Sequence, residues 1–102
     1  MSPKKIFGLK EMQQRFGRMS FGRALRAWRM SEELSQTELA RRLGVTSSTL
    51  ADLEAGRRIP TPARAAKIAL KLGHPIAIWV ELALEDQFLR EKLPLVVSVK
   101  AA

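Results

Sequence analysis

The sequence predicts an all-α domain of five helices, with a basic extension before it and a short β-strand after it. Apolar residues recur every three or four positions through the middle of the chain, which is the spacing of a helix face. Serine or threonine residues precede these runs, and glycine or proline residues follow them, as helix caps and helix stops do. With 102 residues, 46% of them hydrophobic, the chain is long enough for one compact domain with an apolar core.

The first predicted helix covers residues 20–33 and the second covers residues 35–43. Ser20 is suited to cap the first helix, whose apolar residues keep helical spacing. The second helix begins with Ser-Gln-Thr-Glu, in which the serine accepts a backbone N–H and the glutamate reaches back to the serine N–H. Gly44 follows, where a left-handed residue ends a helix and turns the chain.

Three more helices follow. The third covers residues 47–55, between a threonine cap and a second glycine. The fourth runs from Thr61 to Gly73 and has proline in its first turn. The fifth opens at His74 and ends before Pro94, because no helix continues past a proline. The expected organisation is a basic arm or extra helix in residues 1–19, a helical domain in residues 20–90 with two helices around a glycine turn in residues 35–56, and a C-terminal strand in residues 91–102.

Most of the positive charge lies at the N-terminal end. The net charge is +8, and residues 1–29 contain eight basic residues against one acidic residue, so this segment carries +7 of it. The basic residues are Lys4, Lys5, Lys10, Arg15, Arg18, Arg23, Arg26 and Arg29. Because each neutralised phosphate releases counterions, such a segment is suited to lie along a polyanion. The alternative is a solvated tail that keeps the protein soluble.

The C-terminal segment is short and β-branched, and the chain contains no second strand to pair with it. We expect it to pair with its own copy across a two-fold axis, which would join two chains into a homodimer. The fifth helix has an apolar side wide enough to meet both the core and a partner. The residues assigned to dimerisation are Trp79, Leu95, Val96, Val97 and Val99. The alternative is a frayed tail.

Several classes of protein are not expected. The chain has no cysteine, and its single histidine, His74, has no carboxylate pair nearby in the sequence, so we expect no enzyme, no metal site and no cofactor. No glycine-rich phosphate loop follows a strand. No apolar run approaches the ~20 residues that span a bilayer. We therefore expect a soluble cytoplasmic protein without a membrane partner.

Residues 25–73 resemble the Cro and phage-repressor type of helix-turn-helix family, often called XRE. The residues that carry the resemblance are Leu25, Arg29, Ser35-Gln36-Thr37-Glu38-Leu39-Ala40, Leu43-Gly44-Val45-Thr46, Leu50, Leu53, Glu54, Gly56, Pro60, Leu72 and Gly73. The resemblance implies a five-helix, lambda-repressor-like domain that binds double-stranded operator DNA as a dimer, with the third helix in the major groove.

The resemblance also implies particular contacts. The DNA bases would be contacted by Thr46, Ser47, Ser48, Thr49 and Asp52. Phosphates would be bound by Gln36, Arg57 and Arg58. Outside the resemblance, the charge of the arm leads us to expect that Lys4, Lys5, Arg15 and Arg18 also bind phosphates. Arg29 and Glu54 match positions that form a partly buried ion pair.

The chain departs from the family at three places. Hydroxyls and one carboxylate stand where relatives have Gln, Arg, Lys or Asn, so we expect modest direct contact with bases and a larger part for DNA shape. Glu33 replaces a common glycine, which would strain the backbone if its φ is positive. Ala55 stands where relatives often have asparagine.

Two functions are compatible with this resemblance. The first is a homodimeric transcriptional repressor that occupies an operator. The second is an antitoxin, of the HigA type, that neutralises a small ribonuclease toxin and represses its own operon. The sequence does not separate the two, because a dimer and a toxin would use the same C-terminal surfaces.

Overall fold

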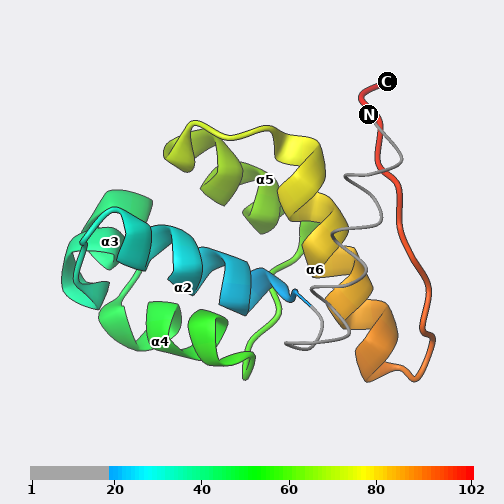
Figure 1. Cartoon of the computed structure of the whole chain (residues 1–102), viewed down its shortest axis with the longest axis horizontal. Coiled ribbons are helices and arrows are strands. Elements are labelled where there is room, and N and C mark those ends of the chain that lie inside the picture. The colour runs from blue at the N-terminus through cyan, green and yellow to red at the C-terminus, as the bar shows by residue number, and fades with distance from the viewer. Residues whose placement is uncertain (1–18) are drawn as a thin grey trace.

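The structure, a computed structural model, describes residues 19–102 and contains five helices there (Figure 1). They are α2 (Phe21–Ser31), α3 (Gln36–Leu43), α4 (Ser47–Ala55), α5 (Pro62–Leu72) and α6 (Ile76–Arg90). The prediction of an all-α, five-helix domain is therefore confirmed. The predicted arm, with its phosphate-binding residues Lys4, Lys5, Arg15 and Arg18, lies outside the described residues except for residue 19.

Four of the five described helices begin at a serine or threonine whose side chain caps them, whereas α6 begins after Pro75 with no side-chain cap. Ser35 and Glu38 make the complete capping box: Glu38 N–H donates to Ser35 Oγ at 3.0 Å, and Ser35 N–H donates to Glu38 Oε1 at 2.9 Å. The bond from the Ser35 backbone N–H to the carboxylate is the largest cause of the lowered pKa of Glu38. Gly44 ends α3 with a φ of 72°, a left-handed conformation that glycine adopts without strain.

All five described helices contribute buried apolar side chains to the core, in which α2 packs on α4 and α6. Phe21 and Leu25 of α2 are buried, and the ring of Phe21 meets the edge of Trp79 with centroids 5.3 Å apart. Trp79 is 4% exposed, so its assignment to a dimer surface is wrong, because its side chain is used to join α6 to α2. Between α2 and α4, Gly22 lies directly against the backbone of the last turn of α4, so the two helices approach closely there.

The strand predicted in residues 91–102 is not present, since residues 93–102 have no regular secondary structure. Figure 1 shows the chain turning after α6 and returning along that helix. The N–H of Val97 donates to Glu85 Oε2 and the N–H of Val99 to Glu81 Oε1, both at 2.9 Å. Two residues of extended chain span about 6.6 Å, and four residues of helix span about 6 Å. The N–H groups of every second tail residue are therefore spaced like carboxylates that lie one turn apart on α6. The extended segment therefore has a partner within its own chain.

The turn between α2 and α3 contains a residue in a strained conformation. Glu33 has a φ of 55° and its side chain is exposed. A left-handed backbone conformation costs a residue other than glycine about 1–2 kcal/mol. Glycine avoids this strain, but it loses more backbone entropy on folding, which offsets part of the gain. We expect Glu33→Gly to raise the free energy of unfolding by about 1 kcal/mol, measured by urea denaturation. Glu32 has a φ of −92° and no such strain, so Glu32→Gly should lower the free energy of unfolding. An equal change in the free energy of unfolding for both variants would contradict this reasoning.

Candidate nucleic-acid interface

One side of α4 is exposed and polar. Its buried residues Leu50 and Leu53 face α2 and α3, and a helix turns by about 100° per residue, so Ser48, Asp52 and Ala55 share the opposite side. The hydroxyl-bearing residues precede Leu50, at the N-terminal end of α4. The exposed side thus combines small side chains with the positive end of the helix dipole, an arrangement suited to close approach to an anion.

The four hydroxyl side chains of this end are not equivalent. Thr46 caps α4, since its Oγ1 accepts the N–H of Thr49 at 3.0 Å, and the two hydroxyls also lie 3.0 Å apart. Ser47 Oγ lies 3.5 Å from Thr37 of α3, a long contact. Ser48 is exposed and its hydroxyl makes no hydrogen bond within residues 19–102. Ser48 is therefore the hydroxyl most accessible to an external partner.

A buried carboxylate connects three helices behind this face. Arg29 of α2 forms a two-point ion pair with Glu54 of α4, with Nε 2.7 Å from Oε2 and Nη2 3.0 Å from Oε1. Gln36 of α3 donates its amide to the same Glu54 oxygen at 3.0 Å. The hydrogen bond to Glu54 is the largest cause of the raised pKa of Arg29. The ion pair expected from the resemblance is thus present, and Gln36 braces α4 from the start of α3.

Two of the residues assigned to DNA contact bind each other. Arg57 Nε lies 2.8 Å from Asp52 Oδ1. The N–H groups of Arg57 and Arg58 also donate to the backbone carbonyl of Asp52, at 3.0 and 3.2 Å. Separate roles were expected for these two residues, because nothing local in the sequence signals that the chain after Gly56 returns to α4.

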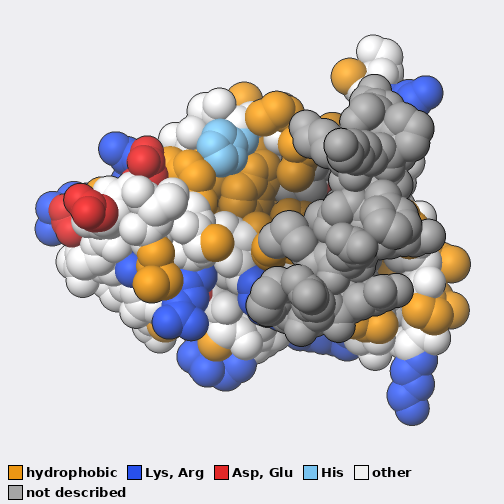
Figure 2. All heavy atoms as spheres, in the orientation of Figure 1, with side chains coloured by type: hydrophobic (Ala, Val, Ile, Leu, Met, Phe, Trp, Pro, Cys, Tyr) orange, Lys and Arg blue, Asp and Glu red, His pale blue; other side chains and the backbone are white. Residues whose placement is uncertain are grey.

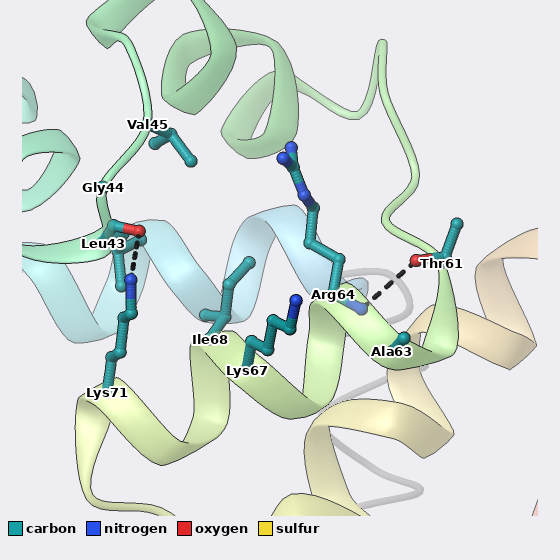
Figure 3. A pocket seen from close by; sticks show the side chains of 9 residues that line it. All are labelled: Leu43, Gly44, Val45, Thr61, Ala63, Arg64, Lys67, Ile68 and Lys71. Carbon is teal, nitrogen blue, oxygen red and sulfur yellow. Dashed lines mark hydrogen bonds between the residues drawn. The ribbon is translucent and has the colours of Figure 1, made fainter.

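A basic groove lies between the α3–α4 turn and α5. It has a volume of about 360 Å³, and Arg64, Lys67 and Lys71 of α5 line it together with Val45 (Figure 3). Lys71 donates to the carbonyl of Leu43 at 2.9 Å, at the C-terminal end of α3. The sequence predicts a phosphate contact less strongly for Arg64 and Lys67 than for Arg57 and Arg58, and it predicts none for Lys71, the third of these cations. Their spacing of three and four residues, which places them on one side of a helix, was the available signal.

Charge is unevenly spread over the surface. Figure 2 shows Lys and Arg side chains along the lower edge of the view, near α4, and acidic side chains mixed with basic ones toward the turn that precedes α3. The single histidine is bordered by hydrophobic side chains on the upper part of this face. There, His74 Nδ1 accepts the indole N–H of Trp79 at 3.1 Å, so His74 has a structural role. Within residues 19–102, no helix is long and apolar enough to cross a membrane, and no three potential metal ligands lie together.

The two short helices α3 and α4, the glycine turn between them and the exposed side of α4 define the class of protein as one with a helix-turn-helix domain. The chain belongs to the helix-turn-helix family, whose model matches residues 25–79, more than half of the chain. The resemblance to the XRE type is thereby confirmed.

One relative is similar over a shorter stretch. A protein named as an uncharacterized HTH-type transcriptional regulator, from Archaeoglobus fulgidus, is 51% identical over 39 residues. These residues are 38% of this chain and 17% of that relative, so the match spans about a sixth of the relative's length. No solved structure is significantly similar to the chain.

Proposed function

We propose that this chain is a sequence-specific DNA-binding transcriptional regulator that inserts α4 into the major groove of double-stranded DNA. The observation that carries the proposal is the exposed N-terminal side of α4, where Ser47 and Ser48 are accessible and the helix behind them is fixed by the buried Glu54 network. A helix fits the major groove, and hydroxyls bond to base edges or phosphates. The family and the name of the Archaeoglobus relative support the same function.

In this proposal the contacts divide by kind. Ser47 and Ser48 contact bases directly, and the half-buried Thr49 and the cap Thr46 support them from the flank. Gln36, braced by Glu54, meets a phosphate on one side of the groove, and Arg58 meets the backbone near the other end of α4. The cations of the basic groove extend this backbone contact along α5. The arm residues keep their predicted role as phosphate ligands.

The test of this function is binding to the DNA upstream of the chain's own gene in the presence of excess nonspecific competitor. We expect a complex that survives the competitor, because base contacts separate specific binding from the salt-dependent attraction of any DNA. A complex that the competitor removes completely would contradict sequence-specific recognition.

We propose further that two copies join through α6 and the segment that lies along it, which would make the regulator a homodimeric repressor. Exposed apolar side chains support this surface: Ile78 is 53% exposed and Val96 94% exposed. Leu89, Leu93 and Leu95 are also exposed large apolar residues. Of the predicted dimer residues, Leu95 and Val96 belong to this surface, while Val97 and Val99 are half-buried beside α6.

The dimer is tested by sedimentation of the full chain and of Ile78→Asp. We expect twice the chain mass for the unchanged protein and a single chain mass for the variant, since a charge placed in an apolar contact stays unpaired. Met30→Asp is the matched control, because Met30 is similarly exposed, on α2, and should leave the dimer intact. An unchanged dimer in Ile78→Asp would contradict this interface.

The same apolar surface is what favours the second candidate, an antitoxin. If the unchanged chain sediments as a single copy, the exposed residues of α6 and the tail have no self-partner and are available to a small toxin. A dimer at micromolar concentration instead supports the repressor.

A further inference from the structure

The exposed side of α4 lacks the side chains that bind base edges most specifically. Ser48, Asp52 and Ala55 share this side, and none of them carries two donors in one plane. The nearest group with two hydrogen-bond donors in one plane is the guanidinium of Arg57, the residue that follows the C-terminal glycine of α4. Gly56 has a φ of 80°, and this left-handed turn reverses the chain so that Arg57 comes back to Asp52.

The ion pair between these residues contributes little to the stability of the fold. The side chain of Arg57 is 64% exposed and that of Asp52 33% exposed, and exposed pairs are worth about 0–1 kcal/mol. The main effect of the ion pair is to orient the guanidinium of Arg57. Arg57 uses Nε for the carboxylate, which leaves the N–H groups of both terminal nitrogens available on a guanidinium whose direction is now restricted.

The charge of the pair distinguishes between two possible partners. A phosphate that approached Arg57 would also meet the carboxylate of Asp52, and the two anions would repel each other. The edge of a guanine carries no net charge and presents two acceptors, O6 and N7, to a planar fork of donors. The paired arginine is therefore better matched to a guanine edge than to the DNA backbone.

We propose that Asp52 holds Arg57 alongside α4 so that the guanidinium binds O6 and N7 of a guanine in the major groove. Arg57 is the base-binding residue, and Asp52 is a positioning residue that acts through it. This inference rests on the proposed function, and it replaces the separate roles expected for these residues, a phosphate contact for Arg57 and a base contact for Asp52.

The experiment begins with selection of preferred sites from random double-stranded DNA by the full chain. We expect one guanine in each half-site at a fixed position, and about tenfold or greater loss of affinity when adenine replaces it. Arg57→Ala and Asp52→Ala should both reduce this preference to less than about twofold. Arg58→Ala is the matched control, since it removes the same charge one residue further on. It should weaken binding to both sites equally and keep the preference.

A modified base gives a second readout that a purely structural role would not move. Replacing the selected guanine by 7-deazaguanine removes the N7 acceptor alone. The unchanged protein should lose several-fold in affinity, and Arg57→Ala and Asp52→Ala should be insensitive to the replacement. Thermal unfolding of each variant checks that it is folded.

The possible results distinguish a failure of the Arg57 inference from a failure of the proposed DNA-binding function. If the unchanged chain selects no sequence at all, both fail. If it selects a site whose guanine preference persists in Arg57→Ala, the inference fails and the proposed function stands. If the preference is lost in Arg57→Ala and kept in Asp52→Ala, the positioning role of Asp52 is wrong.

Discussion

Gly22→Ala is expected to lower the free energy of unfolding by about 3 kcal/mol, although alanine is the better helix former by about 1 kcal/mol. A Cβ at this position would overlap the carbonyl oxygen of Leu53 and lie 2.8 Å from that of Glu54. Both obstacles are backbone atoms of α4, so no side-chain rotation relieves them, and α2 and α4 must move apart. For a domain of this size, such a loss lowers Tm by roughly 10–20 °C.

Gly56→Ala is the matched control for this prediction. Gly56 has a φ of 80°, but a Cβ there would meet nothing within 4 Å. Alanine at this site should therefore cost only the strain of the left-handed conformation, about 1–2 kcal/mol. Calorimetry of both variants compares them directly. If Gly22→Ala were as stable as the unchanged protein, the close contact between α2 and α4 would be wrong.

The second large effect concerns the carboxylate behind α4. Glu54→Ala should lower the free energy of unfolding by about 3–5 kcal/mol, because it leaves the guanidinium of Arg29 partly buried without its counter-ion. The side chains of Arg29 and Glu54 are only 14% and 4% exposed. Gln36 loses a hydrogen-bond partner at the same time. Urea denaturation measures the change.

A double variant distinguishes the cost of leaving one charge unpaired from the cost of removing the two buried side chains. Arg29→Ala together with Glu54→Ala should cost clearly less than the sum of the single changes, since neither charge is then left unpaired. Asp52→Ala provides the exposed comparison, and breaking its pair with Arg57 should cost less than about 1 kcal/mol. Strictly additive costs for Arg29 and Glu54 would contradict the coupling of α2 to α4 through this pair.

The helices could be predicted because their signals are local. The capping box at Ser35 and the glycine at position 44 act within one turn of chain, and the structure has a helix between them. The strain at Glu33 was likewise visible as a departure from a family pattern, and its φ of 55° agrees with it. Such features need no knowledge of what packs against them.

The features that the sequence did not predict depend on contacts between distant residues. The segment after α6 has a strand-like composition, and only the fold brings its N–H groups to Glu81 and Glu85. Trp79 lies on a wide apolar face, and periodicity does not say which part of that face meets Phe21. The pairing of Asp52 with Arg57 depends on a reversal of the chain at a glycine, which the sequence marks only as a helix stop.

The most direct test of the central claim is a mobility shift with DNA from upstream of the gene, for the unchanged chain and for Ser48→Glu. A carboxylate on the exposed side of α4 would face the DNA, and we expect affinity to fall about 100-fold or more, with no change in thermal stability. Ala101→Glu adds the same charge to the exposed tail and should bind like the unchanged chain. Equal, competitor-sensitive binding by all three proteins would show that α4 does not enter the major groove.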